Sequence, residues 1–304
     1  MVLSFSKQHN LKEVILLKKI LILVVFLLFF SQSYSDSVPT FMKLNDNVIK
    51  IIEGRFSHVD LEGLPFSTPD STFSCIIYGD SRWGDRTHEK LVTLMLEFDP
   101  DIVVHLGDMV NNGCDENDWE KFYTITVPLR KSSFFQIVKG NHEKPDTCFE
   151  KHFNLHNYYA TFSDVRFVFL DLELGIDRAE EFLREVATDK TIIFIHYPVF
   201  TAGPHMTDSI VRKARRLHDV FKELGIKVVF SSHDHNYQRF RKEGILYVVT
   251  GGGGAALYDI INKFEPLVYN KIHHFVYIEY NGIWIKAKVI DESGNSIDEF
   301  SIYF

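Results

Sequence analysis

The segment FFQIVKGNHE, residues 134–143, joins an apolar run to polar side chains, and this pattern decides the fold. Residues 134–138 have the length and composition of a buried β-strand, and Gly140 marks the turn that follows. Two earlier segments have the same form, FSCIIYGD (73–80) and IVVHLGD (102–108). Each segment therefore predicts a strand whose carboxyl end carries a residue able to bind a ligand.

Two later apolar runs also end in polar side chains. TIIFI (191–195) is followed by His196, and KVVF (227–230) is followed by SSHDH (231–235). Because the carboxyl ends of strands in α/β sheets line one crevice, we expect these polar groups to lie close together. The predicted cluster consists of Asp80, Asp108, Asn141, His196, His233 and His235.

This cluster combines carboxylate and amide oxygens with imidazole nitrogens. Such mixed donors suit Zn, Mn, Fe or Co, and they argue against a Ca site, which uses oxygens alone. Six donors are too many for one tetrahedral ion but suit two ions that share a carboxylate, as in two-metal hydrolytic sites. The alternative for each residue taken alone is structural, because Gly-Asp turns and loop histidines are common without any ligand.

Helical patterns alternate with these strands, and antiparallel strands follow them. From His274 onwards the pattern predicts antiparallel strands, with a hairpin turn at Asn281-Gly282. We therefore expect one large mixed α/β domain. Thr87 is predicted to cap the first helix. The predicted helices are Thr87–Phe98, Asp115–Arg130, Asp177–Ala187 and Asp208–Leu224.

The composition is that of a folded globular protein. The 304 residues include 33 Lys+Arg and 41 Asp+Glu, which gives a formal net charge of −8, and 45% of the residues are hydrophobic. Three cysteines are too few for a disulfide scaffold. The acid excess argues against nucleic acid as a partner, because nucleic-acid binding needs a basic face. The oligomeric state is left open by the sequence.

Residues 1–35 have the three-part pattern of a secretory signal peptide. Lys18 and Lys19 precede the apolar run Ile20–Phe30, and the small residues Ser33 and Ser35 precede the predicted cut. We therefore expect an exported protein, periplasmic or extracellular, with no membrane span after cleavage. An uncleaved anchor is the alternative. The predicted organisation is a signal peptide (1–35), an N-terminal extension (36–72) and the main domain (73–304).

The three cysteines have different surroundings. Cys75 lies inside an apolar run and is expected to be a buried thiol, whereas Cys114 and Cys148 follow loops assigned to the same site. Export favours an oxidising environment. Because sequence does not give connectivity, we expect two unpaired thiols, with a disulfide between Cys114 and Cys148 as the alternative.

The order of these motifs resembles that of the calcineurin-like metallophosphoesterases. The resemblance covers residues 73–254, and GNHE (140–143) is its most specific motif. HYPVF (196–200), YVVTGGGG (247–254) and GNSIDEF (294–300) resemble the branch similar to purple acid phosphatases. The resemblance implies an α/β fold, a four-layer α/β/β/α sandwich of two mixed β-sheets with flanking helices. For Gly251–Gly254 we expect a turn with a close backbone approach to the site.

The resemblance also implies a dinuclear site of two divalent or trivalent ions, Fe, Mn or Zn. A hydroxide that bridges the ions would attack phosphorus. His142 would donate to a phosphate oxygen or protonate the leaving group, and Glu143 would orient it. The first metal would be held by Asp80, Asp108 and His235, and the second by Asp108, Asn141, His196 and His233.

Three positions depart from the family pattern. Many relatives have a His where this chain has Arg82, and Arg is not a metal ligand, so we expect either a phosphate contact or a salt bridge beside the site. Purple acid phosphatases have a Tyr where this chain has Asn111, so we predict a colourless enzyme. Ser232 replaces the usual Gly and predicts a slightly different loop.

A further histidine follows the motif at His196. His205 lies in the segment 201–205, where relatives place a His facing the substrate, and a solvent-exposed loop His is the alternative. The predicted substrate-binding residues are Arg82, Asn111 and His205.

The function expected from these features is an exported dinuclear-metal phosphoesterase. Its expected partner is a small phosphate-ester substrate, and phosphomonoesters are favoured. One alternative is a phosphodiesterase or nucleotidase, because the site constellation is shared. The other is a metal- or phosphate-binding protein with weak turnover, which Arg82 and the missing nitrogen ligand at the first metal suggest.

Overall fold

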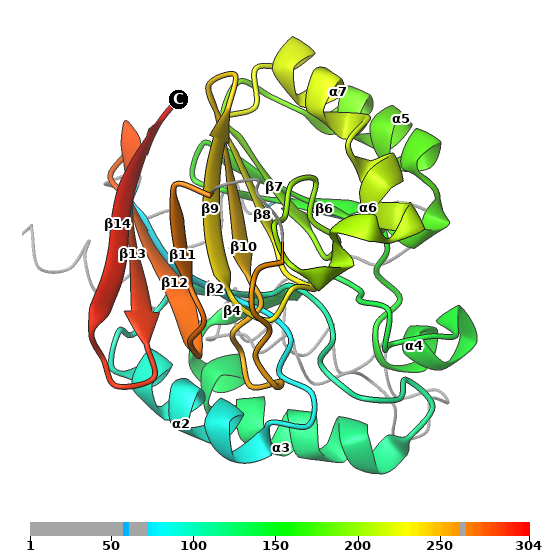
Figure 1. Ribbon diagram of the computed structural model, residues 1–304, viewed down its shortest axis with the longest axis vertical. Coiled ribbons are helices and arrows are strands. Elements are labelled where there is room, and N and C mark those ends of the chain that lie inside the picture. The colour runs from blue at the N-terminus through cyan, green and yellow to red at the C-terminus, as the bar shows by residue number, and fades with distance from the viewer. Residues whose placement is uncertain (1–56, 61–71, 262–265) are drawn as a thin grey trace, which may run out of the picture. The chain divides into compact units, whose positions relative to one another are not determined.

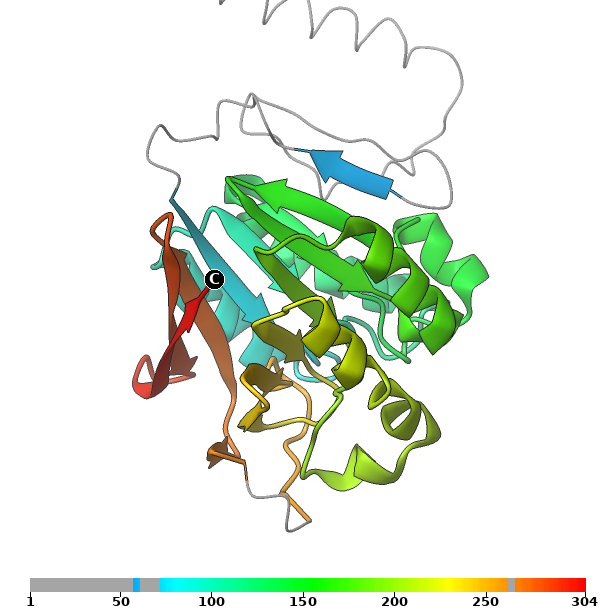
Figure 2. The ribbon, with the colours of Figure 1, turned by 90° about the horizontal axis from the view of Figure 1, so that it is seen from above.

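The computed structural model describes residues 57–60, 72–261 and 266–304, and the strands of these residues form two mixed β-sheets (Figure 1 and Figure 2). The larger sheet, in spatial order, is β1 (Ser57–Asp60), β5 (Tyr158–Phe162), β6 (Val165–Leu170), β7 (Thr191–Ile195), β8 (Val228–Ser231), β10 (Ile245–Thr250), β9 (Tyr237–Lys242) and β11 (Val268–Asn270). The smaller sheet is β14 (Ser296–Tyr303), β13 (Trp284–Asp291), β12 (His274–Tyr280), β2 (Phe73–Tyr78), β3 (Ile102–His105) and β4 (Phe134–Ile137).

Helices lie outside both sheets (Figure 1). The helices α2 (Asp85–Leu96) and α3 (Glu116–Ser132) cover the smaller sheet. The helices α5 (Ile176–Val186), α6 (Ser209–Ala214) and α7 (Leu217–Glu223) cover the larger one. The expected four-layer α/β/β/α sandwich is therefore confirmed. Shorter elements complete the connections: α4 (Asp146–His152), η1 (Leu172–Leu174) and η2 (Pro204–Thr207).

The central strands are apolar on both faces because both faces are covered. Every residue of β7 is buried, and its side chains alternate between two clusters. Ile192 and Phe194 join the cluster between the sheets, which also contains Val276 of β12. Ile193 joins the cluster under the outer helices, which contains Phe182 of α5. This double burial explains why the strand reads as a continuous apolar run.

The strand directions agree with the sequence patterns. β2, β3 and β4 are parallel neighbours, as are β6, β7 and β8. The C-terminal strands β12, β13 and β14 are antiparallel, and the hairpin predicted at Asn281-Gly282 joins β12 to β13. Parallel strands bring their carboxyl ends to one edge of each sheet, so the loops after β2, β3, β4, β7 and β8 can meet.

Two helix predictions need correction. The first helix starts at Asp85 rather than Thr87, and Gly84 occupies the cap position, so Thr87 does not cap it. The single helix expected at Asp208–Leu224 is divided into α6 and α7. Between them, the backbone NH groups of Arg216 and His218 donate to carbonyls three residues earlier, which is a tight 3₁₀ turn.

The cysteine prediction is partly wrong. Cys75 is a buried free thiol, as expected. Cys114 and Cys148 form a disulfide with their Cα atoms 5.2 Å apart, so the favoured expectation of two free thiols is corrected. The pair joins the loop before α3 to α4.

The predicted signal peptide, residues 1–35, lies outside the described residues. Most of the predicted N-terminal extension also lies outside them, except for β1 and Thr72. In the described part of the chain, no helix is both long enough and apolar enough to span a membrane.

Candidate active site

The loops after β2, β3, β4, β7 and β8 bring the six predicted ligands together. Five of them are almost fully buried, and Asn141 is partly exposed. Asp80, Asp108 and His233 have φ values of 58°, 55° and 70°, a region that non-glycine residues rarely adopt. Each such residue costs on the order of 1–3 kcal/mol, and strain of this kind is concentrated at functional sites.

The predicted ligands of the second metal form one compact group. The Nε2 atom of His196 lies 3.1 Å from Nδ1 of His233 and 3.1 Å from Oδ1 of Asn141. It also lies 3.5 Å from Oδ1 of Asp108. Asp108, His196 and His233 each place a donor atom within 4.8 Å of the other two.

The outer nitrogens of these two histidines fix which atoms face inward. His196 Nδ1 donates to the carbonyl of Leu106 over 2.8 Å, and His233 Nε2 donates to Oδ2 of Asp208 over 3.2 Å. His196 Nε2 and His233 Nδ1 therefore face each other as lone pairs, next to the Asn141 oxygen. Because lone pairs at this distance repel unless a cation lies between them, the donor set fits a metal ion.

The predicted ligands of the first metal form a second group. Asp80 Oδ1 lies 3.5 Å from His235 Nε2, and both atoms are within 4.8 Å of a carboxylate oxygen of Asp108. His235 Nδ1 donates to the carbonyl of Ala256 over 2.8 Å, which turns Nε2 inward. Asp80 Oδ1 is buried and has no hydrogen-bond partner. An orphaned buried carboxylate oxygen beside an inward lone pair also fits a cation.

The neighbouring histidines keep Asp80 ionised. Burial raises the pKa of Asp80, but the electrostatic influence of His235, followed by that of His196 and His233, holds it well below its usual value. Burial, together with the charge of His196, lowers the pKa of His233. The surroundings thus favour an ionised Asp80 and a neutral His233, which are the forms that bind metals.

Arg82 forms a salt bridge at the edge of the site. Its Nε donates to Oδ2 of Asp108 over 3.1 Å, and both side chains are buried. Of the two roles expected for Arg82, a phosphate contact or a salt bridge, the structure contains the salt bridge. The guanidinium lies against the carboxylate that both metal groups share.

His142 is oriented by a backbone carbonyl. Its Nδ1 donates to the carbonyl of Asn111 over 2.8 Å, and its Nε2 lies 3.9 Å from Oδ2 of Asp108. Asn111 therefore contributes through its backbone to the position of His142. Glu143 does not orient His142, which corrects the sequence expectation. Its buried carboxylate instead accepts from the backbone NH groups of Asp108, Met109, Val110 and Gly140.

Two residues that the sequence analysis did not assign complete the surroundings. Asp208 accepts from both His233 and His205, whose Nδ1 lies 2.9 Å from its Oδ2. The predicted substrate residue His205 is thus beside a predicted ligand, with ring centroids 4.1 Å apart. Tyr258 stacks on His235 at 4.1 Å. In the sequence, only the position of Asp208 three residues after His205 could have indicated its role. No sequence pattern pointed to Tyr258.

The predicted close approach of the glycine turn is present. A Cβ at Gly251 would lie 2.5 Å from Asp80 Oδ2, and one at Gly253 would lie 2.4 Å from the Gly79 carbonyl. Side chains at these positions would displace the loop that carries Asp80. Ser232, which replaces the usual Gly, donates from Oγ to the Leu106 carbonyl over 2.7 Å. It therefore shares the acceptor that orients His196.

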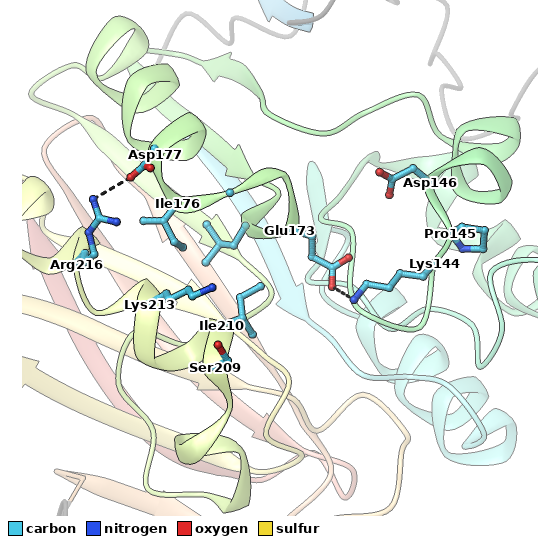
Figure 3. Close-up of a pocket in the computed structure, with 12 residues that line it drawn as sticks. Lys144, Pro145, Asp146, Glu173, Ile176, Asp177, Ser209, Ile210, Lys213 and Arg216 are labelled. Carbon is cyan, nitrogen blue, oxygen red and sulfur yellow. Dashed lines mark hydrogen bonds and ion pairs between the residues drawn. The ribbon is translucent and has the colours of Figure 1, made fainter.

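A cavity of about 760 Å³ opens between the loop at 144–146, the segment 172–177 and α6 (Figure 3). Glu173 lines it and pairs there with Lys144 at 2.6 Å. Glu173 also accepts from the hydroxyl of Tyr197, whose ring packs 4.9 Å from His196 and 4.7 Å from His233. Tyr197 therefore connects the cavity wall at Glu173 to the predicted second-metal group, and no predicted ligand lines the cavity.

Together, two packed mixed sheets with outer helices and buried oxygen and nitrogen donors at the strand ends define an α/β sandwich with a candidate dinuclear metal centre. The model of the calcineurin-like phosphoesterase family matches residues 73–237, and the chain belongs to this family. A search among curated proteins finds no matching sequence.

Solved structures show the same fold at low sequence identity. The purple acid phosphatase PPD1 from yellow lupin (Lupinus luteus) is 18% identical with a TM-score of 0.66, and the match covers 76% of this chain and 54% of the lupin chain. GAP50, the anchor in the inner membrane complex of Plasmodium, is 15% identical (TM-score 0.62; 77% and 89% covered). A dimetal phosphatase from Danio rerio is 12% identical (TM-score 0.55; 76% and 99% covered). This chain thus spans about half of the lupin protein.

Proposed function

We propose that this chain is an exported phosphoesterase that hydrolyses small phosphomonoesters with two metal ions. Asp80, Asp108 and His235 would hold the first ion, and Asp108, Asn141, His196 and His233 would hold the second. The observation that carries the proposal is the 3.1 Å approach of His196 Nε2 to His233 Nδ1, where two lone pairs face each other beside an amide oxygen. When bound, the ions supply Lewis-acid chemistry and lower the pKa of water.

The protein's own side chains position the reacting groups. His142, held at Nδ1 by the Asn111 carbonyl, has Nε2 free to carry the proton that the leaving oxygen needs. Hydrolysis forms one P–O bond from water and breaks the ester P–O bond, and this proton neutralises the departing alkoxide. Glu143 fixes the loop of Asp108 through four backbone hydrogen bonds, so the shared carboxylate keeps its position.

Export is part of the proposal. The leader pattern of residues 1–35 supports it. The Cys114–Cys148 disulfide supports it independently, because structural disulfides form in oxidising compartments. Fractionation of cells that express the full chain, with the cleavage point read by mass spectrometry, tests it. A chain that stays in the cytosol with residues 1–35 attached contradicts it.

A second candidate function is metal or phosphate binding with weak turnover. The buried contact between Arg82 and Asp108 favours it, because this fixed cation lies where the first group needs its carboxylate free. Diester or nucleotide hydrolysis uses the same ligand set and is the alternative within enzymes.

The test is an assay of the purified chain with added Mn, Zn, Fe or Mg on 4-nitrophenyl phosphate and on its bis-ester. We expect hydrolysis of the monoester and a loss of at least about 100-fold in kcat/KM for Asp108→Asn. Asp164→Asn, an exposed carboxylate paired with Lys190, is the matched control and should keep full activity. Full activity in Asp108→Asn would contradict the two-metal proposal, and metal uptake without turnover on either ester would favour the binding protein.

A further inference from the structure

Trp83 is exposed at a position where the backbone makes an aromatic residue costly. The indole is 72% exposed, the largest exposed fraction among the large hydrophobic side chains of the described residues. Its φ is 59°, a left-handed conformation that Gly or Asn adopts far more readily than Trp. Neither core packing nor turn formation accounts for an exposed indole here, so its presence calls for another role.

The loop that carries Trp83 is held rigidly against the site. The backbone NH groups of Ser81 and Arg82 both donate to the carbonyl of Asp108, at 3.1 and 3.2 Å. Gly84 packs so closely on the glycine turn that an added Cβ would lie 2.0 Å from the Gly254 carbonyl. The surrounding fold therefore determines the strained conformation of Trp83 and fixes the direction of its ring.

The ring lies beside Arg82 and beside His142, the proposed proton donor to the leaving group. The guanidinium carbon of Arg82 is 4.9 Å from the indole centroid. The imidazole of His142 is 6.1 Å away and tilted by 65°. The exposed indole is therefore within reach of a leaving group that takes its proton from His142.

We propose that Trp83 is a stacking surface for a planar aromatic leaving group, and that it directs the enzyme toward aryl or nucleoside phosphomonoesters. This inference rests on the proposed function. Aryl and nucleoside esters share a flat π-face, and stacking on an aromatic side chain tolerates different rings. Esters of small aliphatic alcohols lack this face and gain nothing from the indole.

The test compares variants that keep or remove the ring. Trp83→Asn removes it but tolerates a positive φ, and Trp83→Phe retains an aromatic face. Ile283→Ala is the control, because Ile283 is 70% exposed and lies in the β12–β13 hairpin. In Trp83→Asn we expect the ratio of kcat/KM for AMP to that for glycerol 2-phosphate to fall about tenfold, the order of one lost ring stack. Trp83→Phe should recover most of the ratio, and Ile283→Ala should leave it unchanged.

Assays of 4-nitrophenyl phosphate and AMP in parallel distinguish an aryl leaving group from a nucleoside leaving group. An equal loss on all three esters would mean that Trp83 only shapes the loop, and an unchanged ratio would place the leaving group elsewhere; either result overturns the proposal. Calorimetric binding of AMP and glycerol 2-phosphate to the metal-loaded chain gives a second readout without turnover. A further outcome is a wild type that is inactive on all three esters while Trp83→Asn still binds AMP about tenfold more weakly than the wild type does. In that case the proposed function fails and the stacking surface stands.

Discussion

The Nε atom of Arg82 donates a hydrogen bond to Oδ2 of Asp108 over 3.1 Å, and both side chains are buried. Asp108 also accepts from the backbone NH of His142 at its other oxygen, over 3.1 Å. Each oxygen of the carboxylate that both metal groups share therefore accepts a hydrogen bond from the protein. A metal at the group of Asp80 and His235 must compete with the guanidinium for Oδ2.

We predict that Arg82→His strengthens metal binding at this first group. The substitution removes a buried positive charge beside Asp108 and adds an imidazole at the position where many relatives have one. The second equivalent of Mn or Zn should bind about tenfold more tightly or better, as measured by metal analysis after dialysis at several free-metal concentrations. Arg216→His is the control, because Arg216 is exposed and paired with Asp177. Equal affinities in Arg82→His and wild type would show that Arg82 does not compete with the ion.

We predict that metal ions stabilise the fold through Asp80. The buried Oδ1 of Asp80 has no hydrogen-bond partner, so a bound cation would satisfy it. At a free metal concentration of about 100 times Kd, binding to the native state alone adds about 2.7 kcal/mol to the free energy of unfolding. Urea unfolding with metal and with EDTA should show this difference in wild type and a smaller one in Asp80→Asn. A metal-induced gain of equal size in the variant would remove Asp80 from the ligand set.

The meeting of the six candidate donors could be predicted from sequence because each follows a continuous apolar strand. Because both faces of β7 are buried, its sequence is a continuous apolar run, and the polar His196 marks where the strand ends. β9 was not predicted, because its sequence YQRFRK is polar. Its buried Gln238 bonds to Thr201 over 3.0 Å, and Arg239 pairs with Asp298. Partners distant in sequence satisfy these side chains, and a local pattern does not contain them.

The contacts that refine the site are also long-range. Arg82 and Asp108 are 26 residues apart, and no spacing rule relates them. Glu143 was expected to serve its neighbour His142, but it bonds to the Asp108 loop, 35 residues earlier. Tyr258 stacks on His235, 23 residues earlier, and its backbone NH donates to the His235 carbonyl over 2.9 Å. Motif order therefore predicted which side chains lie together, whereas the orientation of each one depends on the folded loops.

We predict that the Cys114–Cys148 disulfide contributes about 3–4 kcal/mol to the free energy of unfolding, given its sequence separation of 34 residues. Its main effect is to reduce the conformational entropy of the unfolded chain. Urea unfolding with and without dithiothreitol measures this contribution. The double variant Cys114→Ser/Cys148→Ser should resemble the reduced protein and should not respond to dithiothreitol. A response in the double variant would assign the effect to something other than this bond.

The final prediction concerns the pH dependence of stability through His156. Burial lowers the pKa of His156, but the hydrogen bond and charge of Asp171 and the hydrogen bond of Glu150 raise it above its usual value. His156 Nδ1 lies 2.7 Å from Asp171 Oδ2. Because the folded state holds the proton more tightly, this stabilisation is fully present below about pH 6.5 and is lost as the pH rises through the folded pKa. The stability difference between wild type and His156→Gln should therefore be larger at about pH 5.5 than at about pH 8.5.

His88 gives a comparison of opposite sign. Burial lowers its pKa to about 3, so the unfolded state takes up the proton first as the pH falls. Its contribution is present above about pH 6.5 and is lost between that value and about pH 3. The stability difference between wild type and His88→Gln should therefore shrink on acidification, whereas that of His156→Gln should grow. Urea unfolding at several pH values measures both, and slopes of the same sign would show that the Asp171 pair does not control His156.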